Sequence, residues 1–256
     1  MKKQILLVLS AAALFVAGNA LGQVVNSFDD LKYWGTGSNQ SALVVSWNDG
    51  TATHTLAWGF RWDGTAPTLF DTLTSIAAMD PRFFLRIDSA TNYGPSLFGI
   101  GYQTGSAAFG ITGAQNTVGD PVTPVFTDGV NDTNTDPLTT QAPFSSITAT
   151  ATNSSDYYEE GWNDNGFWNL YFSGTDPFTT VPGNAYPTTW TAAWVGAGSV
   201  NLVDDGWYAF SFAPNFVDTL PGAAVAAVPE PGSVALILFA AGVLFVISCR
   251  HRSLLA

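Results

Sequence analysis

Charged side chains and aromatic rings alternate in one short stretch of this sequence, a combination that could bind a carbohydrate. Arg61 and Asp63 flank Trp62, and Trp58 lies shortly before them. In a strand, Arg61 and Asp63 would share one face, and Trp62 would lie on the other. One interpretation stacks a sugar ring on Trp58 or Trp62, and the polar pair binds its hydroxyls. The other, which we favour, buries the rings in the core and leaves Arg61 to pair with Asp63 or to stack on an aromatic ring.

A second stretch places the adjacent carboxylates Glu159 and Glu160 between Tyr158 and Trp162, again the composition of a carbohydrate cleft. A glycosidase needs two opposed carboxyl groups about 5 to 9.5 Å apart. Because neighbouring residues of a strand point to opposite faces, Glu159 and Glu160 would not form such a pair by themselves. One of them would need Asp164 or a more distant aspartate as its partner. We favour a solvated turn for this stretch.

A third cluster, in a polar segment, could hold a metal ion. Asp128, Asp132 and Asp136 alternate there with the amides of Asn131 and Asn134. Calcium prefers such oxygen ligands, but an EF-hand would need a glycine and a terminal glutamate at fixed positions that this cluster lacks. Loops rich in Asp and Asn are also common without any metal. Calcium is therefore the one cofactor that the sequence leaves open, and we expect no other.

The residues needed for nucleophilic or zinc catalysis are not grouped in this sequence. His54 is the one histidine apart from His251, which lies near the C-terminus. A zinc site would need further His or Cys ligands, and a serine hydrolase would have a recognisable nucleophile motif. We therefore expect no catalytic residues, a surface position for His54, and a protein that is not an enzyme.

The amino-acid composition excludes some classes of binding partner. The chain has 20 acidic and 8 basic residues and a net charge of −12, which opposes binding to the phosphates of nucleic acid. Hydrophobic residues make up 46% and charged residues 11%, a balance typical of globular proteins and not of disordered acidic chains.

Short apolar runs between turn residues predict strands. They cover residues 41–47, 55–62, 83–87, 106–111, 167–172, 190–195 and 207–212, with a hairpin turn at 48–50. Helical spacing of apolar residues over 67–79, ended by Asp80 and Pro81, predicts one short helix. The sequence therefore predicts a mainly β domain over 23–220, a sandwich or jelly roll, with a long loop near 112–146 and a linker at 221–227.

The N-terminus has the three parts of a signal peptide. Lys2 and Lys3 precede an apolar run over 5–17, and Ala20 and Gly22 supply the small residues that signal peptidase requires. We expect cleavage after Gly22, which makes residues 1–22 the signal peptide.

The C-terminus combines a short motif with an apolar run. Pro229, Glu230 and Pro231 precede uncharged residues 232–248, and Arg250 and Arg252 follow. A helix over 232–248 would reach about 26 Å, close to the roughly 30 Å of a bilayer core. Because basic residues stay cytoplasmic, we expect this helix to hold the chain in the inner membrane with the domain outside. Cys249 is the single cysteine, so the domain must be stable without an internal disulfide.

This order of Pro-Glu-Pro, apolar run and basic tail over 228–256 resembles the PEP-CTERM sorting signal of Gram-negative bacteria. The resemblance implies that an exosortase-type membrane protease acts near Pro229 to Pro231, after signal peptidase has acted. It also implies delivery to the cell surface or extracellular matrix, often with exopolysaccharide. A simple tail anchor is the alternative.

Residues 58–64, Trp-Gly-Phe-Arg-Trp-Asp-Gly, and residues 205–207 resemble an uncharacterised family of exported PEP-CTERM proteins that supplies no activity. We therefore expect a structural, adhesive or carbohydrate-binding role for the central domain. The alternative is an extracellular polysaccharide hydrolase that uses paired carboxylates.

Overall fold

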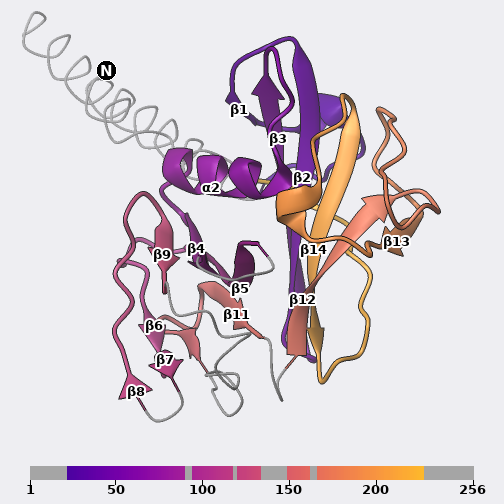
Figure 1. Ribbon diagram of the computed structural model, residues 1–256. Helices are drawn as coiled ribbons and strands as arrows, with labels where there is room; N and C mark the ends of the chain where they lie inside the picture. The colour runs from indigo at the N-terminus through magenta and orange to yellow at the C-terminus, as the bar shows by residue number, and fades with distance from the viewer. Residues whose placement is uncertain (1–21, 90–93, 118–119, 134–148, 162–165, 228–256) are drawn as a thin grey trace, which may run out of the picture.

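The computed structural model describes residues 22–89, 94–117, 120–133, 149–161 and 166–227 (Figure 1). Residues 1–21 of the expected signal peptide lie outside these ranges, as do the membrane helix expected at 232–248, the Pro-Glu-Pro motif, the basic tail, Asp136 and Trp162. Within the described ranges, no helix is long and apolar enough to cross a membrane.

The larger sheet combines strands from both ends of the domain (Figure 1). Its order is β1 (Tyr33–Gly35), β3 (Thr53–Trp62), β2 (Asn39–Asn48), β14 (Gly206–Pro214), β12 (Gly166–Ser173) and β13 (Trp190–Ala192), and β15 (Val225–Ala226) also pairs with β3. Strands β2 and β3 form an antiparallel hairpin in which Asn48 lies opposite Thr53. Its turn includes Gly50 at a φ of 82°, a conformation that glycine adopts without strain. This is the hairpin that the sequence predicts.

The smaller sheet has the order β11 (Tyr157–Glu160), β5 (Ser96–Tyr102), β4 (Phe83–Asp88) and β9 (Val130–Asp132). Two short pairs accompany it, β6 (Ile111–Thr112) with β10 (Thr150–Ala151), and β7 (Gln115–Thr117) with β8 (Asp120–Pro121). Helix α2 (Leu69–Met79) begins at a capping box in which Thr68 and Asp71 bind each other's backbone amides. The short 3-10 helices η1 (Phe28–Asp30) and η2 (Ala197–Ser199) complete the described elements.

Both faces of the larger sheet are covered, as the alternation along β2 shows. Leu43, Val45 and Trp47 belong to the main core, which includes residues of α2 and β4. Ala42 and Val44 point the other way, into a second cluster with residues of η1 and β15. The mainly β prediction, with one α-helix in the described part of the chain, is confirmed, and the packed sheets are consistent with a β sandwich.

Two segments expected to be connections carry short strands. The described part of the loop expected near 112–146 contains β7, β8 and β9, and β9 pairs in parallel with β4. The linker expected at 221–227 contains β15, and paired structure continues to Ala227. Conversely, the strand expected at 106–111 is reduced to its end, where β6 begins. Strands of two or three residues are too short to show a side-chain periodicity, and β9 and β15 are held by backbone pairing with strands far away in the sequence.

Candidate functional site

The first predicted stretch lies largely in the core. Trp58 is fully buried and donates its indole N–H to Asp80 at 3.0 Å, and Trp62 is also buried in the main core. Arg61 is exposed, with its guanidinium carbon 4.3 Å from the centre of the Tyr33 ring. Asp63 instead accepts hydrogen bonds from the backbone N–H and hydroxyl of Ser38. The structure therefore does not bring these rings and polar groups together as an accessible sugar site.

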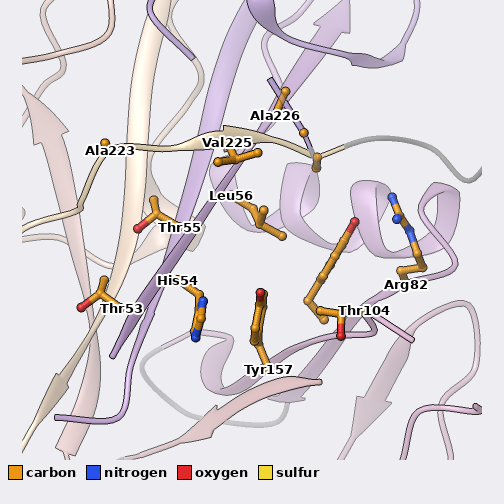
Figure 2. A pocket seen from close by; sticks show the side chains of 13 residues that line it. Thr53, His54, Thr55, Leu56, Arg82, Thr104, Tyr157, Ala223, Val225 and Ala226 are labelled. Atoms are coloured by element: carbon orange, nitrogen blue, oxygen red, sulfur yellow. The ribbon is translucent and has the colours of Figure 1, made fainter. Parts of the chain in front are cut away.

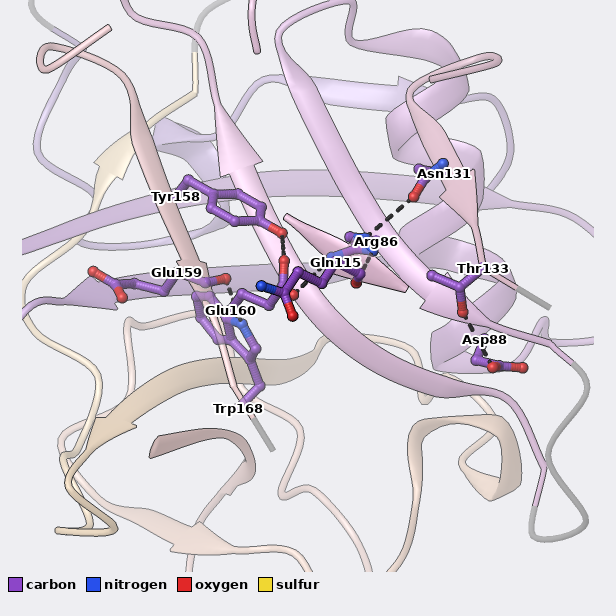
Figure 3. A network of polar contacts seen from close by, with 9 residues as sticks. All are labelled: Arg86, Asp88, Gln115, Asn131, Thr133, Tyr158, Glu159, Glu160 and Trp168. Atoms are coloured by element: carbon purple, nitrogen blue, oxygen red, sulfur yellow. Dashed lines mark hydrogen bonds and ion pairs between the residues drawn. The ribbon is translucent and has the colours of Figure 1, made fainter. Parts of the chain in front are cut away.

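The second stretch, in β11, separates its two carboxylates, as the alternation of a strand requires (Figure 3). Glu160 is buried and accepts hydrogen bonds from Arg86, at 2.7 Å, and from the Tyr158 hydroxyl. Arg86, itself fully buried, also donates to the Gln115 carbonyl at 2.6 Å and to the Asn131 side chain at 3.3 Å. Burial, and next the charge of Glu160, raises the pKa of Tyr158 well above its usual value. A buried ion pair with this many hydrogen bonds joins β4 and β11 and is closed to ligands.

Glu159 points away from this network (Figure 3). Its side chain is partly buried, and this burial, with a smaller effect from the charge of Asp49, raises the pKa of Glu159 to about 8. Asp49 lies in the turn of the β2–β3 hairpin and accepts hydrogen bonds from the N–H groups of Ala52 and Thr51, each at 2.7 Å. These bonds lower the pKa of Asp49. The pKa values of these two carboxyl groups are therefore shifted in opposite directions.

Two adjoining hollows lie where the end of the β2–β3 hairpin meets β11, and we call them together the hairpin groove. The first has a volume of about 460 Å³ and the second about 500 Å³. His54 and Tyr157 line both hollows, and their rings stack with centres 4.3 Å apart and planes 11° apart (Figure 2). Trp47 lies behind Tyr157, with ring centres 5.6 Å apart. The groove is thus built around an aromatic stack that is open to solvent on the His54 side.

Each hollow offers polar groups beside this stack. The first is lined by Thr53, Thr104 and Arg82, and the second by Asp49 and Glu159, with the side chains of residues 153–156. The guanidinium carbon of Arg82 lies 5.0 Å from the centre of the Tyr102 ring. Its Nε is 3.6 Å from an oxygen of Asp80, and both Nε and Nη2 are buried without a hydrogen-bond partner among the described residues. These two donors are therefore closed to a ligand in the groove.

The first hollow has an unexpected third wall. Residues 223 and 225–227 line it opposite Tyr157 (Figure 2), together with Gly22, the last residue of the expected signal peptide. The C-terminal end of the domain, next to the expected exosortase site, therefore helps to form the groove.

The acidic cluster proposed for calcium is dispersed in its described part. Asp132 accepts hydrogen bonds from the backbone N–H and hydroxyl of Ser89, and Asp128 is exposed in a turn with a φ of 49°. Across the described ranges, no group of three His, Cys, Asp or Glu side chains is placed to hold a metal ion. Calcium binding stays a prediction that rests on residues partly outside these ranges.

A match to a protein family identifies the C-terminal segment of the chain. Residues 227–253 match the family described as the PEP-CTERM protein-sorting motif. The chain therefore carries a PEP-CTERM sorting signal. This signal marks an exported protein with transient membrane anchoring that an exosortase-type enzyme processes, as the sequence predicts. Neither the comparison with curated proteins nor that with solved structures found a match, so the resemblance of residues 58–64 to an exported family stays a prediction.

Sequence reasoning missed the two central residues of the groove in this PEP-CTERM chain. The sequence predicts only a surface position for His54, and no pattern in it distinguishes Tyr157 from its neighbours. What makes them a pair is the hairpin register, which sets His54 opposite Trp47, and the packing of Tyr157 on Trp47. No local pattern reports a contact between segments so far apart along the chain.

Proposed function

We propose that the mature domain is a non-catalytic carbohydrate-binding protein of the cell surface or extracellular matrix, and that its ligand occupies the hairpin groove. The observation that carries this proposal is the solvent-open stack of His54 and Tyr157, set between two polar hollows. Exopolysaccharide, which often accompanies the sorting system, is the ligand class that we propose.

The chemistry of the groove suits sugars. A sugar ring presents C–H groups that pack on aromatic rings, and hydroxyls that need closely placed donors and acceptors. Tyr157 and His54 supply the rings, and Thr53, Thr104 and Asp49 supply hydroxyl and carboxylate oxygens. Arg82 adds a positive charge to the lining of the first hollow. We propose that binding needs no cofactor, so chelation should not weaken it.

Replacing Tyr157 tests this proposal. We expect Tyr157→Ala in the processed mature protein to raise the dissociation constant for a bound glycan about tenfold or more, because a packed aromatic contact is lost. Glycan-array screening followed by calorimetry would measure it.

The matched control is Trp194→Ala. Trp194 is 75% exposed and packs edge-to-face on Phe178 outside the groove, whereas the other tryptophans in the described ranges are buried. This control should bind like the wild type. Equal affinities of Tyr157→Ala and wild type, or a loss confined to Trp194→Ala, would place binding elsewhere.

A second candidate function is hydrolysis of a polysaccharide, which the difference between Glu159 and Asp49 favours. A carboxylic acid with a raised pKa beside an ionised carboxylate is the arrangement that glycosidases use as acid and base or nucleophile. Both residues line the second hollow.

Product formation separates the two candidates. Under hydrolysis, the wild type releases reducing sugars, and Glu159→Gln reduces the rate at least a hundredfold because the proton donor is removed. Asp176→Asn, an exposed carboxylate that does not line the groove, should have no effect. Binding without any product from the wild type would eliminate the hydrolase.

A further inference from the structure

The two ends of the domain meet in a small β structure. Val25 donates its backbone N–H to the Ala224 carbonyl at 2.9 Å, and Ala226 donates to the Gln23 carbonyl at 2.8 Å. Val24 and Val225 lie opposite each other as an antiparallel bridge. The residues that follow the expected signal-peptide cleavage therefore pair with those that precede the Pro-Glu-Pro motif.

The C-terminal partner of this pairing, residues 224–227, is here called the stem. It also lies in parallel against β3, with Val225 opposite Leu56 and Ala226 opposite Ala57. Ala227 donates its N–H to the Ala57 carbonyl at 2.8 Å. The stem is thus held on two sides, by β3 and by the N-terminal segment.

Packing explains why the stem is rich in alanine. Ala224, Ala226 and Ala227 are 0%, 3% and 1% exposed, and Ala224 and Ala226 pack in the second core cluster. Side chains larger than alanine would be obstructed at these buried positions. The alanine-rich composition of residues 224–227, which suggests a linker, therefore belongs to a strand that is packed with little space for larger side chains.

The stem ends next to the sorting motif. One residue, Val228, separates Ala227 from Pro229 in the sequence. A protease that acts near Pro229 to Pro231 must hold the chain on both sides of the bond that it cuts. Peptide chains are commonly bound in extended form through their backbone N–H and carbonyl groups, and the same groups of the stem are already used by β3 and residues 23–25.

We propose that the edge of β3 and the N-terminal segment compete with the exosortase-type enzyme for the stem. Processing then proceeds through the fraction of molecules in which the stem is detached. Its rate follows the equilibrium between docked and detached stem when that exchange is fast. The folded domain thereby sets how quickly its own precursor leaves the membrane. This proposal rests on the sorting signal and not on the carbohydrate function.

A reversible cross-link tests the competition directly. Opposed residues of an antiparallel pair have Cα atoms about 4.5 to 5.5 Å apart, a separation that a disulfide can bridge. We would place cysteines at both Val24 and Val225 in the full precursor and express it in a host that contains the sorting enzyme. Loss of the tail is followed by pulse labelling and mass measurement. We expect the oxidised double variant to stay unprocessed and a reductant to restore processing.

The two single-cysteine variants, which like the double variant keep Cys249, are the controls and should be processed at the wild-type rate. If Val225→Cys alone slowed processing, the effect would come from the altered substrate sequence. Processing of the oxidised double variant at the wild-type rate would overturn the proposal.

A second variant loosens the stem without changing its sequence. Val25 is 3% exposed, and its neighbour Val24 is 55% exposed. Val25→Asp would bury a charge beside the stem and is expected to speed processing roughly 5- to 30-fold. Val24→Asp introduces the same charge at the surface and should behave like the wild type.

Retention of a protease-resistant core by Val25→Asp separates local detachment from general unfolding. Equal processing rates for Val25→Asp and Val24→Asp, with that core intact, would contradict the competition. Should the core be lost, the cross-linked variant, which does not disturb packing, decides the question by itself.

Discussion

Glu159 and Glu160 are neighbours in β11, yet their carboxyl groups lie on opposite faces of the strand (Figure 3). Glu160 is surrounded by donors from Arg86 and Tyr158, so its charge is balanced within the protein. Glu159 lines the hairpin groove, and burial raises its pKa to about 8. Two glutamates next to each other therefore have different roles: Glu160 is part of a structural ion pair, and Glu159 is a titratable group near neutral pH.

The raised pKa of Glu159 predicts a particular pH dependence of stability. In the unfolded chain a glutamate titrates near 4.3, so between about pH 4.3 and 8 the folded state binds a proton that the unfolded state has released. The contribution of Glu159 is fully present below the unfolded pKa and is lost as the pH rises through the folded pKa. We expect the free energy of unfolding of the wild type to fall relative to that of Glu159→Gln over this range.

Urea unfolding of both proteins at pH 5 and pH 9 measures this difference. Glu159→Gln keeps the size of the side chain but cannot ionise. Its free energy of unfolding should therefore increase relative to that of the wild type only as the pH rises. A difference that stays constant between the two pH values would show that Glu159 titrates as in water.

At the scale of elements, much of the fold is predictable because long strands and the helix carry their own patterns. The apolar runs of β2 and β3, the turn between them and the helical spacing before Asp80 are local signals, and the structure has these elements. The prediction that Glu159 and Glu160 face opposite ways needs only strand geometry. The candidate groove could not be predicted in this way, because it depends on how Tyr157 of β11 packs against Trp47 and His54 of the hairpin.

The shortest strands could not be predicted from the sequence either. In β15 the exposed and buried positions do not form a readable period, and its alanines look like those of a linker. Its position is fixed instead by backbone bonds to β3 and to residues 23–25, which lie at the other end of the chain. Such pairing is a property of the assembled sheet, so it becomes visible only when both partners are in place.

At the scale of the whole molecule, the groove and the stem share a wall. Residues 225–227 line the first hollow opposite Tyr157, and they are also the residues that must detach if the sorting enzyme is to hold the stem (Figure 2). A ligand that fills the groove therefore has contacts with the docked stem that it would lose on detachment. By linkage, binding to one state alone shifts the equilibrium toward that state.

This linkage gives a prediction that joins both proposals. A glycan that binds the groove should slow removal of the tail, and at a concentration 100 times its dissociation constant the detached fraction should fall about a hundredfold. The measurement is the processing rate of the full precursor in membranes that contain the sorting enzyme, with and without the glycan identified by array screening. Tyr157→Ala, with a dissociation constant about tenfold higher, should be slowed only about tenfold at the same glycan concentration. If the glycan binds the wild type but leaves its processing rate unchanged, the ligand does not contact the stem and the shared wall has no role in sorting. If the cross-link also fails to block processing, the stem does not compete with the enzyme at all, because the two tests perturb the same equilibrium by independent means.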